Sequence, residues 1–254
     1  MPSAMKPMPW PLWIAHRGAG RLAPENTLAA FRLGAAHGYS AFECDVKLSS
    51  DGVPFLLHDA TLDRTTDGRG VAGERTWAEL SRRDAGAWHG RAWAGEPIPT
   101  FDAIASFCLR NGHALNIEIK PTPGQERVTG EVAAREAARR WAGQAMPPLL
   151  SSFQAAALEG ARAAAPELPR ALLLDSLHEG WFDQARALGC VAVVANFNVY
   201  QRDMVERLHA AGLWALAYTV NDESPARWLL GLGLDGLITD AVDRFSPHAG
   251  RLGT

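Results

Sequence analysis

Cysteine is scarce in this chain, and the few cysteines present are not arranged for pairing. Cys44, Cys108 and Cys190 are the three, and none of them belongs to a CxxC motif. An odd number without paired spacing argues against a disulfide framework. Unpaired cysteines are typical of proteins from reducing compartments, so we expect a cytoplasmic location.

Long apolar runs and long basic runs are also missing. No stretch of about 18 apolar residues occurs, so we expect no membrane span. The first residues, MPSAMKPMPWPLW, have one lysine and three prolines before Trp10, which makes a poor secretory signal. The formal net charge is −3, and we expect no nucleic-acid partner. The sequence does not indicate the oligomeric state.

Short apolar runs alternate with alanine-rich amphipathic stretches along the chain. This order predicts parallel strands with helices outside them, and the length suits one α/β domain over residues 1–254, a (β/α)8 TIM barrel. The nine strand candidates, one more than a barrel needs, are Leu12–Ala15, Ala41–Leu48, Val53–Leu57, Ala114–Ile119, Pro148–Ser152, Arg170–Leu174, Val191–Ala195, Leu213–Val220 and Asp235–Thr239. The helix candidates between them include Thr27–His37, Glu131–Ala142, Phe153–Ala165, Gly180–Leu188, Gln201–Ala211 and Glu223–Leu230.

Two connections depart from this alternation. The second and third strand candidates are separated by Ser49–Gly52 alone, which is too short for a crossover helix and predicts a hairpin or an extended return. The segment after the third candidate is long, and it ends in a predicted helix over Phe101–Arg110. Long insertions are often functional, so we expect a small insertion subdomain over about residues 59–113 beside the barrel mouth.

Reactive side chains gather where the first four predicted strands end. In chain order they are His16 and Arg17, Glu43 and Asp45, His58 and Asp59, and Glu118 and Lys120. Because the carboxyl ends of parallel barrel strands share one face, we expect these side chains to form one site.

Three carboxylates in this set predict a metal site. Glu43 and Asp45 are two residues apart and therefore point to the same side of a strand. Together with Glu118 they would repel one another unless a cation compensates them. Oxygen ligands without cysteine suit a hard ion, so we expect one Mg²⁺ or Ca²⁺. The apolar flanks in AFECDVKL and LNIEIK argue against solvated surface carboxylates, because burial without a partner is costly.

Histidines and cations complete the candidate site. His16 and His58 lie next to the predicted metal, and a pKa near working pH suits them to acid–base catalysis. Arg17 and Lys120 either neutralise the carboxylates or bind phosphate oxygens, and both roles are open.

Several other polar residues have simpler interpretations. We expect Asp240 to form a helix cap or turn, and Asn221 either to orient the substrate or to cap the next helix. The remaining histidines are expected in helices, loops or the tail without a catalytic role: His37, His89, His113, His178, His209 and His248.

At this point the motifs resemble a known family. AHRGAGRLAPENTLAAF, FECDVKLSSDGVPFLLHDATLDRTTDGRG, LNIEIKP, SSF, YTVND and DGLITD occur in the order seen in glycerophosphodiester phosphodiesterases, over about Trp13 to Asp240. The resemblance implies a phospholipase-C-like (β/α)8 barrel with a small insertion after the third strand. The intracellular bacterial members are the most similar.

The resemblance also implies roles for individual residues. The implied ligands of one divalent cation are Glu43, Asp45 and Glu118; the implied acid and base are His16 and His58; the implied phosphate contacts are Arg17 and Lys120; and Glu25 and Asn26 of the ENT motif support the site. Tyr218 stands where the family usually has tryptophan before TVN, which alters one wall of the substrate site.

We therefore expect hydrolysis of glycerophosphodiesters to glycerol 3-phosphate and an alcohol. Two alternatives are a lysophospholipase-D-type enzyme on the same scaffold, which would need an apolar channel for an acyl chain, and a non-catalytic metal- or phosphate-binding module. The sequence leaves open the headgroup, the metal used, which histidine is the acid, and whether the nucleophile is water or the substrate 2-hydroxyl.

Overall fold

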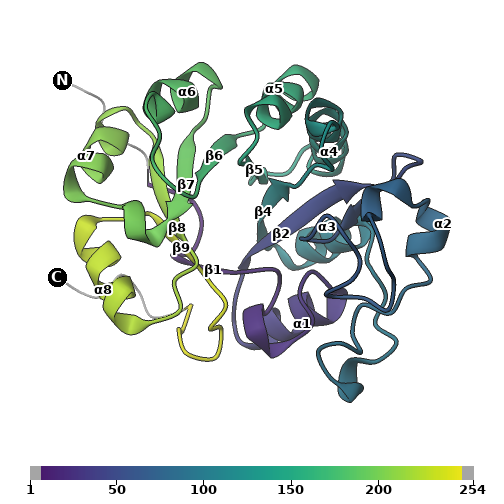
Figure 1. Cartoon of the computed structure of the whole chain (residues 1–254). Helices are drawn as coiled ribbons and strands as arrows, with labels where there is room; N and C mark the ends of the chain where they lie inside the picture. Colours follow the sequence, from purple (N-terminus) through teal and green to yellow (C-terminus); the bar gives the residue numbers. More distant parts are fainter. Residues whose placement is uncertain (1–6, 248–254) are drawn as a thin grey trace.

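A closed barrel of eight parallel strands forms the centre of the computed structural model, which describes residues 7–247 (Figure 1). Strand β1 pairs with both β9 and β2, and this closes the ring. The barrel strands are β1 (Trp13–Ala15), β2 (Ala41–Leu48), β4 (Ala114–Ile119), β5 (Leu149–Ser152), β6 (Arg170–Leu174), β7 (Ala192–Asn196), β8 (Trp214–Tyr218) and β9 (Gly236–Thr239). The predicted (β/α)8 barrel is confirmed.

Helices cover the outside of the barrel (Figure 1). They are α1 (Leu28–Ala36), α3 (Phe101–Asn111), α4 (Glu126–Arg140), α5 (Ala155–Ala164), α6 (Trp181–Ala187), α7 (Arg202–Ala210) and α8 (Glu223–Leu232). Short 3-10 helices η1 (Gly20–Leu22) and η4 (Phe197–Val199) follow β1 and β7. Threonines begin two of the helices, because Thr27 and Thr100 each accept a backbone N–H of the first turn at 3.2 Å.

The period of two along each strand divides the core into two layers. In β6, Ala171 and Leu173 point into the barrel, whereas Leu172 and Leu174 belong to the layer between strands and helices. Both sets are buried. Strands buried on both faces read as continuous apolar runs, which explains why the sequence predicted them well.

The third strand candidate, Val53–Leu57, lies outside the barrel. Strand β3 (Pro54–Leu56) runs antiparallel to β2, with Leu48 opposite Pro54 and Val46 opposite Leu56. The hairpin over Ser49–Gly52 brings the chain back, so that Leu57 N–H donates to the Asp45 carbonyl at 3.1 Å. His58 thus reaches the barrel mouth on a returning strand. The hairpin expected over Ser49–Gly52 is confirmed, whereas the expectation that His58 ends a parallel barrel strand was wrong.

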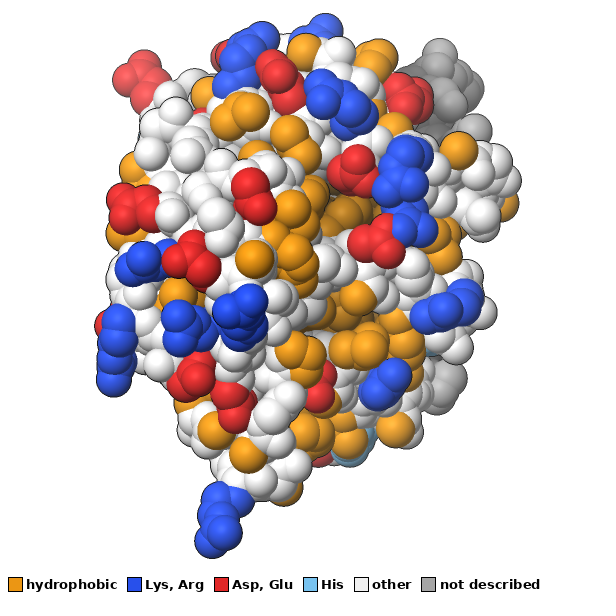
Figure 2. Space-filling view, turned by 90° about the vertical axis from the view of Figure 1, so that its right-hand side faces the viewer, with side chains coloured by type: hydrophobic (Ala, Val, Ile, Leu, Met, Phe, Trp, Pro, Cys, Tyr) orange, Lys and Arg blue, Asp and Glu red, His pale blue; other side chains and the backbone are white. Residues whose placement is uncertain are grey.

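The segment between β3 and β4 has its own small core beside the barrel. It contains η2 (Ala72–Glu74), α2 (Trp77–Leu80) and η3 (Arg91–Trp93), and its buried apolar residues are Phe55, Leu57, Leu62, Ala72, Leu80, Ala85 and Ile98. Helix α3, at the end of the segment, contributes Phe101 and Ile104 to the core of the barrel instead. On the face nearest α2, acidic and basic side chains are interspersed around hydrophobic ones (Figure 2).

Within residues 7–247, no helix combines the length and the apolar character needed to cross a membrane. The secretory-signal prediction rests in part on residues 1–6, and these residues and His248 lie outside the described range.

Candidate active site

Three carboxylates meet at the mouth of the barrel. One oxygen each from Glu43, Asp45 and Glu118 lies within 4.8 Å of the others, and all three residues are buried. Strand register explains the convergence, because Asp45 on β2 is paired with Glu118 on the neighbouring strand β4. Glu43 lies two residues before Asp45 and therefore points to the same side.

Burial and the mutual repulsion of the carboxylates shift the pKa values of the triad. Burial, together with the charges of Asp45 and Glu118, raises the pKa of Glu43 well above its usual value. Burial and the charge of Asp45 also raise the pKa of Glu118 to about 7, against the opposing effect of Lys120. Burial acts on Asp45 as well, but the positive charges of Arg17 and Lys120 outweigh it and bring that pKa to about 2.

The donor set of the triad fits a divalent cation. Within residues 7–247, the buried oxygens Oε1 of Glu43 and Oδ1 of Asp45 have no hydrogen-bond partner. Buried carboxylate oxygens without partners are costly, and oxygen atoms of this kind are the preferred ligands of Mg²⁺ and Ca²⁺. The triad is therefore a group of residues that could hold such an ion.

Arg17 and two residues of the ENT motif, Glu25 and Asn26, hold the triad in position from one side. The Arg17 backbone N–H donates to Glu43 Oε2 at 3.0 Å, while its guanidinium Nε lies 3.2 Å from Asp45 and its Nη1 donates to Glu25 at 2.8 Å. Asn26 binds Asp45 twice: its amide donates to Oδ2 at 2.8 Å, and its Oδ1 accepts the Asp45 backbone N–H at 3.1 Å. Arg17 and Asn26 both have positive φ, 51° and 60°. Such backbone strain is common at functional sites.

His16 is held by a carboxylate from the last strand of the barrel. Its Nδ1 lies 2.6 Å from Oδ1 of Asp240, and its Nε2 lies 3.7 Å from Glu43. The Asn221 side chain fixes Asp240 in turn, since its amide donates to Oδ2 at 3.1 Å and its oxygen accepts the Asp240 backbone N–H at 2.8 Å. Asp240 is therefore not the helix cap or turn we expected. Asn221 does not cap helix α8 either, because Asp222 occupies that position.

Gly20 allows the loop after His16 to lie against Asp240. Its φ of 54° is in the left-handed region, and a Cβ atom there would lie 2.1 Å from the Asp240 carbonyl oxygen. The next residue, Arg21, donates its backbone N–H to that same carbonyl at 3.1 Å. A side chain at position 20 would push the His16 loop and Asp240 apart.

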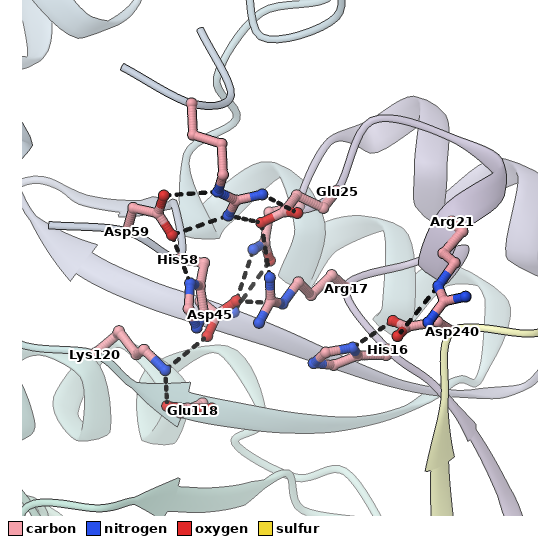
Figure 3. Close-up of polar contacts among 12 residues, drawn as sticks. His16, Arg17, Arg21, Glu25, Asp45, His58, Asp59, Glu118, Lys120 and Asp240 are labelled. Carbon is pink, nitrogen blue, oxygen red and sulfur yellow. Dashed lines mark hydrogen bonds and ion pairs between the residues drawn. The ribbon is translucent and has the colours of Figure 1, made fainter. Parts of the chain in front are cut away.

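His58 is held by a second carboxylate on the other side of the triad. Its Nδ1 lies 2.7 Å from Oδ1 of Asp59, and Arg64 from the insertion donates to both oxygens of Asp59 at 2.7 and 2.9 Å. The same guanidinium donates twice to Glu25 at 2.8 Å. Burial, with help from the nearby cations, lowers the pKa of His58. Figure 3 shows His16 and His58 on either side of Arg17 and Asp45.

Lys120 and Tyr218 line the remaining walls. Lys120 Nζ donates to Glu118 at 2.6 Å and lies 3.8 Å from Asp45. Tyr218 lies in the wall of a central cavity of about 150 Å³ and donates its hydroxyl to the Leu174 carbonyl at 3.1 Å. Its ring meets that of Phe153 edge to face at 5.9 Å.

The groups that orient the two histidines were not predicted from the sequence. Asp59 was noted only by its position, Asp240 was expected to form a helix cap or turn, and Arg64 was not singled out. Asp59 could have been predicted from the sequence, because it directly follows His58. No local pattern connects Asp240 to His16, since they are 224 residues apart and meet only when the barrel closes.

Comparisons with known proteins identify the family to which the chain belongs. The model of the glycerophosphoryl diester phosphodiesterase family matches residues 16–244. The protein YhdW of Bacillus subtilis is 35% identical over 240 residues, which cover 91% of this chain and 94% of that protein. A glycerophosphodiester phosphodiesterase of Caldanaerobacter subterraneus is 32% identical over 90% of this chain and 93% of its own.

A solved structure agrees with these sequence matches. An Oleispira antarctica phosphodiesterase in complex with the product sn-glycerol-3-phosphate superposes with a TM-score of 0.88. It is 37% identical and covers 92% of this chain and 95% of its own. The resemblance inferred from the motifs is confirmed: the chain belongs to the glycerophosphoryl diester phosphodiesterase family and is an enzyme of that activity.

Proposed function

We propose that the enzyme hydrolyses small glycerophosphodiesters to glycerol 3-phosphate and an alcohol by acid–base catalysis between His16 and His58. The observation that carries this proposal is the placement of the two imidazoles on either side of Arg17 and Asp45 (Figure 3). The Oleispira relative that binds sn-glycerol-3-phosphate supports the choice of product.

A divalent cation, Mg²⁺ or Ca²⁺, is proposed for the triad of Glu43, Asp45 and Glu118. The unpartnered buried oxygens of Glu43 and Asp45 support this assignment. When bound there, the ion supplies positive charge that favours a phosphate oxygen in the transition state.

The cationic side chains orient the phosphate. Arg17 and Lys120 present guanidinium and ammonium groups at the edge of the triad, where each is already paired with a carboxylate. Both donate hydrogen bonds to non-bridging phosphate oxygens and offset the charge that develops there. Glu25 and Asn26 hold Arg17 and Asp45 in position.

The histidines exchange protons with the reacting oxygens. Asp240 and Asp59 hold Nδ1 of His16 and His58, which leaves each Nε2 for the substrate. One Nε2 removes a proton from the attacking oxygen, of water or of the substrate 2-hydroxyl, as that oxygen forms its bond to phosphorus. The bond from phosphorus to the leaving alcohol breaks, and the other imidazole donates a proton to that alcohol oxygen. If the 2-hydroxyl attacks, water then opens the cyclic phosphate to give glycerol 3-phosphate. Atoms and charges balance because one proton is taken up and one is released.

We further propose that the chain works as one domain with its insertion beside the barrel, and that it functions in a reducing, cytoplasmic compartment. The hydrogen bonds from Arg64 to both Glu25 and Asp59 support the first point, because they tie the insertion to the site. The buried free thiols of Cys44, Cys108 and Cys190 support the second.

An assay of choline release from glycerophosphocholine tests the proposal directly. We expect turnover with Mg²⁺ or Ca²⁺, loss of turnover in EDTA, and recovery when the ion is restored. Release of phosphocholine instead of choline would show that the other ester bond is cut. Full turnover by metal-stripped enzyme would rule out the role given to the triad.

A further inference from the structure

Lys47 is a buried cation with few partners. It follows Glu43 and Asp45 at the same period of two on β2 and is only 2% exposed. Its Nζ donates one hydrogen bond, to the Lys120 carbonyl at 3.0 Å. Within residues 7–247 no carboxylate lies within the 4.0 Å of an ion pair with it. An ammonium has three donors, so Lys47 retains donors for a ligand.

Lys47 is one of the residues that line a large cavity adjoining the site. Lys47 lines a cavity of about 430 Å³ together with Pro121 and Glu126. The residues His58, Glu118, Lys120 and Phe153 line both this cavity and the central cavity of about 150 Å³. The smaller cavity suits the glycerol phosphate that all substrates share. The larger cavity adjoins the smaller one at His58. It therefore suits the leaving alcohol, which differs from one substrate to another.

The charges of the larger cavity do not favour a cationic alcohol. Glu118 is paired with Lys120 at 2.6 Å, and Asp59 is paired with Arg64 at 2.7 Å. One oxygen of half-buried Glu126 accepts the Gly124 backbone N–H at 3.0 Å. Of these three carboxylates, Glu126 alone has no ion pair within residues 7–247, and the positive charge of Lys47 in the same cavity lining opposes its negative charge.

A cation already lies over the Phe153 ring in the wall of this cavity. Lys120 Nζ lies 5.3 Å from the centre of the Phe153 ring. A quaternary ammonium would therefore compete with Lys120 for that ring. A hydroxyl group, in contrast, can accept a hydrogen bond from Lys47 and replace the water that a buried donor would otherwise need.

We propose that Lys47 donates hydrogen bonds to hydroxyl groups of the leaving alcohol, so that the enzyme prefers glycerophosphodiesters of polyols to those of choline. This inference rests on the proposed function, because it assigns the cavity next to His58 to the leaving group. Lys47 is then a residue that determines specificity, and the acid–base residues remain those named above.

Steady-state kinetics with three substrates test the inference. The substrates are glycerophosphoglycerol, glycerophosphoinositol and glycerophosphocholine, and the variants are Lys47→Met, which keeps the length of the side chain without its donor, and Glu126→Gln. We expect the native enzyme to have a kcat/KM for the two polyol diesters roughly tenfold or more above that for the choline diester. Lys47→Met should remove this preference by lowering only the polyol values, whereas Glu126→Gln should keep it.

Each other outcome counts against the inference. A native enzyme that prefers the choline diester refutes it without any variant. An equal loss on all three substrates in Lys47→Met, with melting temperature and Ca²⁺-induced stabilisation retained, places Lys47 at the shared glycerol phosphate. A selective loss of choline-diester turnover in Glu126→Gln identifies an ammonium site instead. No turnover of any diester with Mg²⁺ or Ca²⁺ refutes the proposed function itself, and this inference with it.

Discussion

Nδ1 of His16 lies 2.6 Å from the carboxylate of Asp240, across the junction between the first and last strands of the barrel. Asp240 is fixed by two hydrogen bonds with Asn221, so the imidazole is held in one orientation with Nε2 directed at the site. The closure of the barrel therefore supplies the group that orients one of the two proposed catalytic histidines.

Replacing Asp240 with asparagine tests this arrangement. The amide can no longer hold the same tautomer of His16, so we expect kcat to fall roughly 10²-fold with little change in melting temperature. Asp235→Asn is the matched control, because Asp235 lies 3.0 Å from His209 in a similar pair outside the site. Equal losses of kcat in both variants would mean that Asp240 has only a structural role.

The two histidines should be separable by substrate. Replacing either His16 or His58 with alanine should lower turnover of glycerophosphocholine roughly 10²–10⁴-fold. A nitrophenyl ester needs little help from a general acid, so it should restore activity only in the variant that lost the acid. His209→Ala provides the control. Near-normal turnover by both alanine variants would disprove the acid–base assignment.

Glu43→Gln should abolish the response of the enzyme to added Mg²⁺ or Ca²⁺. The native protein should gain thermal stability when Mg²⁺ or Ca²⁺ is added, because an ion that binds only the folded state stabilises it. The glutamine variant should show no such gain in stability and no cation-dependent turnover. In EDTA it should melt at a temperature no lower than that of the native protein, because burial already raises the pKa of Glu43. A variant that still responds to the ion would exclude Glu43 as a ligand.

Stability without a cation should fall as the pH rises. The pKa of Glu118 is about 7 in the folded protein, above its usual value of 4.5. A group with a raised folded pKa contributes stability that is complete below its unfolded pKa and is lost as the pH passes its folded pKa. In EDTA, the melting temperature should therefore decrease between about pH 4.5 and 7, and Glu118→Gln should flatten the decrease.

The affinity of the enzyme for the cation should change with pH in the opposite direction to its stability in EDTA. Protons and the ion compete for the same carboxylates, so the affinity for Ca²⁺, measured by calorimetry, should rise with pH up to about 7. An affinity that does not change between pH 5 and 8 would show that Glu118 is already ionised or does not bind the ion.

Arg64→Gln should alter the pH profile as well as the rate. The Arg64 guanidinium lies 2.7 Å from the Asp59 carboxylate and offsets part of its negative charge. Without Arg64, the full negative charge of Asp59 would act on His58. The pKa of His58 should rise, so the limb of the kcat/KM profile that His58 governs, acidic if it is the base and alkaline if it is the acid, should move to higher pH. Arg69→Gln is the control, because Arg69 is an exposed arginine of the same insertion, paired with Asp63. A rate loss without a shift of the limb would indicate a structural role alone.

The sequence by itself determined the barrel and most of the carboxylate triad. Strands such as Arg170–Leu174 are buried on both faces and read as apolar runs, and the spacing of Glu43 and Asp45 fixes their common side. These features are local, because they depend on periodicity within one element.

Only the tertiary structure decided how the histidines are held and which route His58 takes. The antiparallel return of β3 places His58 level with Asp45, and the junction of β9 with β1 brings Asp240 to His16. The orphaned donors of Lys47 likewise become evident only when its neighbours are known. A sequence pattern records which side a residue points to, whereas the partner it meets depends on strand pairing across the closed barrel, between residues far apart in the chain.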